Sequence, residues 1–175
     1  MANEQQVFNR LKSKLQNAVS SLPKVFGNEA VNFFTDSFNK QGWEDRSLSP
    51  WVPRKKTKKG TGRAILVETG KMRRAIKIGS TGPTRVTIVN DDPKARIHNN
   101  GGKIVQQPRS ETFQRNRFKK GSKKGKFKKG TSAGRGFTFK ARTINIPQRK
   151  FMGHSYALVQ RLREVGKIVI AKAMK

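Results

Sequence analysis

The 175-residue sequence contains no cysteine and only ten acidic residues, against 40 lysines and arginines. Without cysteine the chain can form no disulfide, thiolate nucleophile or common zinc site, and nothing indicates an oxidising compartment. No apolar run approaches the ~20 residues that a membrane-spanning helix needs. The first residues have neither the basic region nor the apolar stretch of a secretory signal peptide. We therefore expect a soluble protein made in the cytosol.

Apolar residues are also scarce, at 33% of the chain, while the formal net charge is +30. The length favours one domain spanning residues 1–175, with a core that is modest for its size. A charge this large predicts a polyanion, or neighbours that supply negative charge, as the partner.

The positive charge is concentrated between Gly101 and Arg142. This segment has fourteen lysines or arginines against one acid, Glu111, which leaves a net charge of +13, and it is rich in glycine. It has too few aliphatic residues to offset its ordering entropy alone, so we predict an extended basic arm, 101–142, that a partner holds in place. A second basic run, Arg54 to Lys59, is predicted to form a loop.

Cations and phenylalanines alternate within the arm, as in proteins that bind phosphates and stack on unpaired bases. The candidate nucleic-acid or partner-binding residues are Arg115, Arg117, Phe118, Lys119, Lys120, Lys123, Lys124, Lys126, Phe127, Lys128, Lys129 and Arg135. Docking on an acidic protein explains the same composition equally well, since charge does not separate DNA from an acidic protein surface.

The remainder of the chain has the patterns of a folded α+β protein. Apolar residues at helical spacing from Val7 to Val19 predict one helix, which Ser20–Pro23 is predicted to interrupt. The stripe from Phe26 to Phe38 predicts a second helix that ends near Gly42. A last helix is predicted to begin after Ser155 as its N-cap. We expect a small antiparallel sheet flanked by these N- and C-terminal helices, with the long basic arm inserted.

Shorter elements are predicted between the helices. The alternation in 84–90 predicts a strand, and 137–142 and 143–146 predict one or two more. Thr69 is predicted to cap a short helix that extends through Ile76. Asp92-Pro93 is predicted to begin a turn or short helix that leads to His98. The segment 43–53 is predicted to be irregular.

Patterns typical of enzymes are missing. His98 and His154 have no metal-binding spacing, no Gly-x-Ser-x-Gly nucleophile turn occurs, and the ten carboxylates form no clustered pair. We expect neither catalysis nor a cofactor or metal. A nuclease or other enzyme remains as an alternative only if Asp91, Asp92 and His98 converge on a metal ion.

Four short segments occur in a characteristic order: Pro50–Pro53, Leu66–Met72, Ala95–Gly102 and Ile146–Ser155. They resemble the tailed-phage virion-morphogenesis family, which includes tail-completion and head–tail neck proteins. Its members have Trp-x-Pro, Leu-Val-Asp-Thr-Gly-x-Leu, Tyr-Ala-x-x-His-x-x-Gly and Ile-Pro-x-Arg-Pro-Phe-Leu-Gly elements before a C-terminal helix. The resemblance covers roughly Pro23 to Lys175 without the arm, and departs from the pattern at Glu68, Met72, Lys94 and Lys150.

At the matching positions we predict structural roles. Arg149 is expected to bond carbonyls, Phe151 to anchor the turn in apolar surroundings, and Pro147 to end a strand. Gly70 is expected to allow close backbone approach and Gly153 a bend into the last helix. The full set of matching positions is Trp51, Thr69, Gly70, His98, Gly101, Pro147, Arg149, Phe151 and Gly153.

The resemblance implies a non-enzymatic virion protein at the head–tail junction, in a neck, head–tail connector, tail-completion or tail-terminator role. It implies a homo-oligomeric ring, hexameric or dodecameric, whose partners are the adjacent connector and tail proteins and packaged double-stranded DNA, with no membrane. Such a protein is present in host cytoplasm during assembly and afterwards in the virion. The alternative is a sequence-independent nucleic-acid-binding protein, which composition alone favours.

Overall fold

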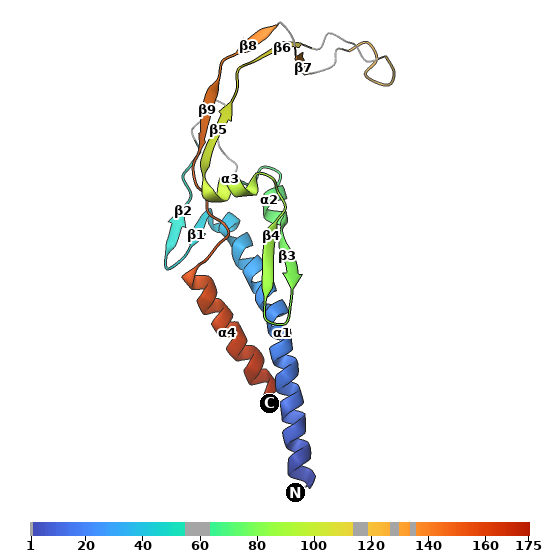
Figure 1. The fold of residues 1–175 in the computed structure, drawn as a ribbon, viewed down its shortest axis with the longest axis vertical. Helices are drawn as coiled ribbons and strands as arrows, with labels where there is room; N and C mark the ends of the chain where they lie inside the picture. The colour runs from blue at the N-terminus through green and yellow to red at the C-terminus, as the bar shows by residue number, and fades with distance from the viewer. Residues whose placement is uncertain (1, 55–63, 114–118, 127–129, 134–135) are drawn as a thin grey trace. The chain divides into compact units, whose positions relative to one another are not determined.

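The structure is a computed structural model that describes residues 2–54, 64–113, 119–126, 130–133 and 136–175. It has the predicted α+β fold, with small antiparallel sheets between an N-terminal and a C-terminal helix (Figure 1). The chain divides into two compact units. Unit 1 comprises residues 1–101 and 147–175, and unit 2 comprises residues 102–146.

Unit 1 is built around its two long helices, α1 (Ala2–Lys40) and α4 (Tyr156–Ala173), which pack against each other. The close approach is visible at Gly166 of α4, where an added Cβ would lie 3.3 Å from the ring of Phe26. On α1, Gly27 faces Ile78 and Val86 in the same way, so the hairpin of β3 (Ile76–Thr81) and β4 (Val86–Asn90) also packs on this helix.

Three short elements complete unit 1. A hairpin pairs β1 (Gly42–Glu44) with β2 (Leu48–Pro50). The single-turn helix α2 (Lys71–Arg74) precedes β3, and α3 (Ala95–Asn100) follows β4.

The core of unit 1 is aromatic. Phe33, Phe34 and Phe38 of α1 are buried, as the predicted stripe requires, and Phe33 and Phe34 contact the ring of Trp43. Phe38 packs on Trp51 at 5.4 Å and on Phe151 at 5.0 Å between ring centroids. Segments far apart in the sequence are thus joined through one cluster of rings, which buries a large apolar area.

The prediction that Ser20–Pro23 separates two helices is wrong, because α1 is one 39-residue helix with Pro23 inside it. A proline inside a helix costs about 3 kcal/mol through its missing N–H and its ring. Pro23 is buried, and the apolar stripe that follows it is buried as well, so packing on that side offsets the cost.

Two further predictions in unit 1 need correction. The segment 43–53 is not wholly irregular, because its first eight residues contain the β1–β2 hairpin with Pro50 at the end of a strand, where no ladder N–H is required. The helix after Thr69 ends at Arg74 rather than at Ile76, which begins β3. Its N-cap is Gly70 rather than Thr69, because the chain turns there through a left-handed conformation at φ 67°.

Other local predictions for unit 1 are confirmed, whereas the loop predicted from Arg54 to Lys59 lies outside the described residues after Arg54. The strand predicted at 84–90 is β4, and α3 follows the Asp92-Pro93 turn. Ser155 is the N-cap of α4, and its side chain accepts a hydrogen bond from the N–H of Leu158. Ser155 also donates to the carbonyl oxygen of Glu44 (2.8 Å), so the cap fastens the last helix to the first hairpin.

Unit 2 is a set of antiparallel strands within the predicted arm region. The strand β5 (Gly102–Gln106) pairs with β9 (Arg142–Ile146), placing Ile104 opposite Ile144. A three-stranded sheet has the order β7-β6-β8, from β6 (Arg109–Phe113), β7 (Thr131–Ala133) and β8 (Phe137–Phe139). The strands at 137–139 and 142–146 agree with the sequence prediction. Those at 102–113 and 131–133 were not predicted, because their pattern is weak and pairing with distant partners satisfies their backbone groups.

Candidate functional site

Three of the four family-like segments meet at one junction in unit 1. The indole Nε1 of Trp51 donates a hydrogen bond to the carbonyl oxygen of Lys150 (2.7 Å), while the backbone N–H of Trp51 donates to Gln41 (2.8 Å). The backbone N–H of Arg149 donates to the carbonyl oxygen of His98 (2.8 Å). The bonds to Lys150 and His98 join parts of the chain that are 99 and about 50 residues apart.

Arg149 fixes the junction through its side chain. Its guanidinium is buried and donates from Nε (3.1 Å) and Nη2 (2.9 Å) to the single carbonyl oxygen of Val52. Burial, and then the nearby charge of Arg54, lower the pKa of Arg149. Arginine remains charged in proteins, so this is a charge-assisted pair of bonds, and it is the carbonyl contact that the sequence predicts for Arg149.

Asn99 is a junction residue that the sequence did not single out. Its side-chain oxygen accepts the backbone N–H groups of both Phe151 and Met152, each at 2.9 Å. Phe151 is 1% exposed, so the apolar anchor predicted for it is confirmed. The only sequence signal for Asn99 was its position next to His98 in a family-like segment.

Two glycines permit the sharp turns of the junction. Gly101 adopts φ 72°, and a Cβ there would lie 3.0 Å from the backbone nitrogen of Gln148. Gly153 adopts φ 140°, just before α4, as its predicted bend requires. Pro147 directly follows β9, in agreement with its predicted place at a strand's end.

Lys150 stands where the family pattern has proline. Its ammonium lies 4.6 Å from the centre of the Trp43 ring and donates to the carbonyl oxygen of His154 (3.2 Å). A cation over a tryptophan face is stabilising, so this departure from the pattern has a structural use in this chain.

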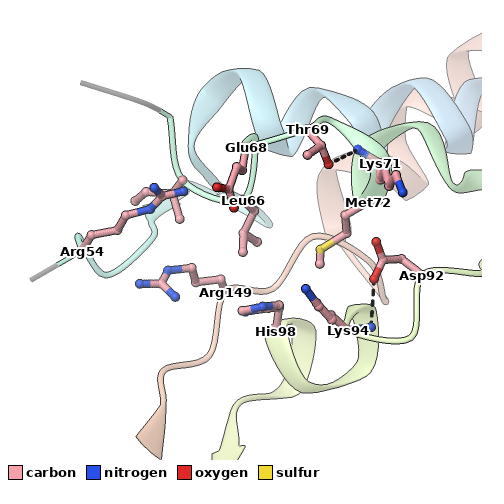
Figure 2. Close-up of a pocket in the computed structure, with 11 residues that line it drawn as sticks. Arg54, Leu66, Glu68, Thr69, Lys71, Met72, Asp92, Lys94, His98 and Arg149 are labelled. Atoms are coloured by element: carbon pink, nitrogen blue, oxygen red, sulfur yellow. Dashed lines mark hydrogen bonds between the residues drawn. The ribbon is translucent and has the colours of Figure 1, made fainter. Parts of the chain in front are cut away.

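A pocket of about 260 Å³ opens beside the junction (Figure 2). Leu66 and Met72 form an apolar side, and Arg149 and His98 face them across the cavity. The complete lining consists of Arg54, Ile65, Leu66, Glu68, Thr69, Lys71, Met72, Asp92, Lys94, His98 and Arg149. Leaving the histidine aside, four of these side chains are basic and two are acidic, so the pocket carries a net positive charge.

The environment of the His98 imidazole in this pocket favours its neutral form. Its Nδ1 is buried and has no hydrogen-bond partner among the described residues. Burial lowers the pKa of His98, the charges of Arg149 and Lys94 lower it further, and Asp92 opposes them. The imidazole is therefore held in its neutral form near pH 7, a state suited to packing rather than to anion binding.

Other polar groups around the pocket hold turns. The hydroxyl of Thr69 accepts the backbone N–H of Lys71 (3.4 Å), and Asp92 Oδ1 accepts that of Lys94 (2.9 Å). Asp91 forms an ion pair with Lys77. In the described part of the chain no three His, Cys, Asp or Glu side chains are grouped to hold a metal ion.

Five of the twelve predicted arm residues lie in a described part of unit 2. Lys119, Lys120, Lys123, Lys124 and Lys126 are all exposed. Backbone hydrogen bonds from Lys124 to Gly121 and from Lys126 to Lys123 form the turns that carry them. The structure thus presents five cations and no carboxylate over 119–126. The other seven lie outside the described residues: Arg115, Arg117, Phe118, Phe127, Lys128, Lys129 and Arg135.

Within the described ranges, no helix is both long and apolar enough to cross a membrane.

Comparison with known proteins gives one match. The model of the phage virion morphogenesis family matches residues 2–169, which extends the resemblance seen in the sequence to α1. No curated protein and no solved structure matches the chain significantly. The family match covers nearly all of both units, including every segment of the junction. The chain therefore belongs to the phage virion morphogenesis family.

Proposed function

We propose that the protein is a non-enzymatic structural component of the phage head–tail junction. It forms a homo-oligomeric neck or tail-completion ring that joins the connector to the tail. Its basic arm contacts adjacent rings or the DNA that passes through the junction. The observation that carries this proposal is the family match over residues 2–169, which supports a role in virion assembly.

The geometry of the junction supports a structural role for the family-like residues. The side chains of Trp51, Asn99 and Arg149 bind backbone groups, and Phe151 lies in the aromatic core. These contacts hold the backbone of the junction, which is a structural role. The contacts with other virion proteins are then made by the exposed surfaces.

The exposed lysines at 119–126 support the role of the arm. Lysine ammonium groups bind phosphates or carboxylates as mobile point charges. Clustered cations gain affinity for DNA largely through counterion release. An acidic rim on a neighbouring ring would be attracted by the same charges.

The lysine cluster also favours a second candidate function, sequence-independent binding of nucleic acid. The two functions differ in where the protein resides. A junction protein is present in mature particles at a fixed copy number near six or twelve. A free nucleic-acid-binding protein binds DNA tightly as a monomer and is missing from particles.

The test is quantitative mass spectrometry of purified virions together with complementation of a phage that lacks the gene. The arm variant replaces Lys119, Lys120, Lys123, Lys124 and Lys126 with glutamine. A matched variant makes the same change at five exposed lysines of unit 1 that lie away from the N-terminal part of α1: Lys71, Lys77, Lys167, Lys172 and Lys175.

We expect the arm variant to fold but to leave heads and tails unjoined, and the matched variant to support joining. Absence of the protein from particles refutes the junction function. Normal joining by the arm variant refutes the role of the arm alone.

A further inference from the structure

The N-terminal part of α1 extends past all its packing partners. Every residue from 4 to 17 is exposed, whereas Pro23, Gly27 and Ala30 further along the helix are buried. Large apolar side chains nevertheless lie in this exposed part, with exposed fractions of 62% for Val7, 60% for Phe8, 41% for Leu11, 38% for Leu15 and 51% for Val19. Helices in proteins are stabilised mostly by packing of an apolar face, so this exposed face is suited to a partner.

The spacing of these residues is that of a helix-pairing seam. Phe8, Leu11, Leu15, Ala18 and Leu22 alternate at intervals of three and four, and none of them is charged. This is the a/d pattern by which two helices supercoil around each other. α4 already packs on α1 around Phe26, so the uncovered part of the seam is the part that precedes it.

We propose that this seam, residues 8–22 of α1, pairs in parallel with the same seam of a second copy of the chain. The inference rests on the proposed homo-oligomer and names a surface through which its subunits associate in twos. A two-fold axis parallel to the helices makes both run in the same direction, and a larger ring closes through other surfaces. Identical stripes that face each other form a self-complementary interface.

The area is sufficient for such a pair. Phe8, Leu11 and Leu15 of the seam, together with Val7 and Val19 beside it, present on the order of 500 Å² of apolar surface. Two copies together bury about 1,000 Å², which reaches the lower limit of a specific protein interface.

The charges beside the seam give the pairing a diagnostic salt dependence. Between residues 5 and 28 the helix has four cations, Arg10, Lys12, Lys14 and Lys24, and no acid. Pairing therefore brings like charges together, and salt screens their repulsion. Self-association through the seam strengthens as salt is raised, whereas binding of an acidic protein or of DNA weakens.

The test uses the full chain, whose lack of cysteine allows a single engineered thiol to report on proximity. Leu15→Cys places the thiol in the seam, and Ser13→Cys places it on the opposite face of the same exposed helix. We expect oxidation to give a disulfide-linked dimer for Leu15→Cys and none for Ser13→Cys. Equal cross-linking of the two variants, or none of Leu15→Cys, overturns the proposal.

Analytical ultracentrifugation supplies the second measurement. We expect the dissociation constant between copies to fall several-fold from 50 to 500 mM salt. The double substitution Leu11→Gln, Leu15→Gln should weaken association at least tenfold, while the control Gln6→Ala, Ser13→Ala should leave it unchanged. Because all four residues are exposed, the melting temperature of either variant should equal that of the unchanged chain at a protein concentration at which the copies are dissociated.

Failure of this inference is distinct from failure of the proposed function. Association that is unaffected by the leucine substitutions, in a protein still found in virions, rejects the seam and leaves the junction function intact. Association that weakens with salt shows an electrostatic contact and rejects the seam as well.

Discussion

Removal of a single buried oxygen at Ser155 should measurably destabilise unit 1. Ser155 is 1% exposed, and its hydroxyl accepts the N–H of Leu158 (3.2 Å) while donating to the carbonyl oxygen of Glu44 (2.8 Å). Loss of an N-cap costs typically about 1 kcal/mol, and a lost hydrogen bond that leaves a carbonyl unpaired costs about another 1 kcal/mol. We therefore expect Ser155→Ala to lower the free energy of unfolding by about 2 kcal/mol.

The assay is urea unfolding followed by helical circular dichroism, with thermal melting alongside. A loss of about 2 kcal/mol corresponds to a fall in melting temperature of about 4–8 °C for a chain of this size. The matched control is Ser20→Ala, because the exposed hydroxyl of Ser20 donates to the carbonyl oxygen of Asn17 (2.9 Å) within one helix. The control should change stability by less than about 0.5 kcal/mol. If Ser155→Ala loses no more than the control, the hydroxyl does not fasten α4 to the β1–β2 hairpin and the reasoning is wrong.

Three further outcomes are expected. Gly101→Ala should lower the free energy of unfolding by about 1–3 kcal/mol, because φ is 72° and the new Cβ would lie 3.0 Å from the backbone of Gln148. Urea titration measures this loss, and an unchanged unfolding midpoint contradicts the prediction. The free energy of unfolding should fall as pH drops below about 6.5, because the pKa of His98 is lower in the folded chain than in the unfolded chain. The unfolded chain therefore binds a proton at this site more readily and is favoured at low pH. His98→Asn should flatten that part of the pH profile, and His154→Asn, at an exposed site, is the control that should leave it unchanged. Replacement of the five described arm lysines by glutamine should reduce the slope of log affinity for DNA against log salt concentration by up to about 4.5. Fluorescence anisotropy measures this slope, and an unchanged slope contradicts a role of the arm in DNA binding.

The elements predicted correctly from the sequence are those whose signals are local. The alternation in 84–90 gives β4, and Ser155 precedes an amphipathic run that becomes α4. The phenylalanine stripe of α1 is buried because its spacing is helical and a partner surface exists. The α+β class follows from such local signals.

The errors arise where distant packing overrides a local preference. Pro23 is a strong local signal for a helix boundary, yet α1 continues through it. Thr69 is a good N-cap residue, but Gly70 alone tolerates the left-handed turn that precedes α2. The strands of 102–113 have weak intrinsic patterns, and their partners lie about 20 to 40 residues away.

The junction could be predicted only in part for the same reason. The residues that resemble the family pattern were identified, but which carbonyl Arg149 binds depends on the tertiary structure. The bond from Trp51 to Lys150 and the bond from the Phe151 N–H to Asn99 span 99 and 52 residues. Asn99 was missed because its contact with the Phe151 and Met152 backbone is of this long-range kind.

The net charge of +30 constrains how the proposed assembly can be held together. Identical subunits of this charge repel one another, so contacts between copies must come from neutral surface, and the uncharged seam of α1 provides it. The proposed contacts with DNA or acidic neighbours would gain from the same charge, and the lysines at 119–126 are exposed for that role. The two kinds of contact respond to salt in opposite directions. A salt titration of the full chain with and without DNA therefore separates them: self-association should rise and DNA binding should fall over the same range. If both fall together, charge rather than the apolar seam holds the copies together.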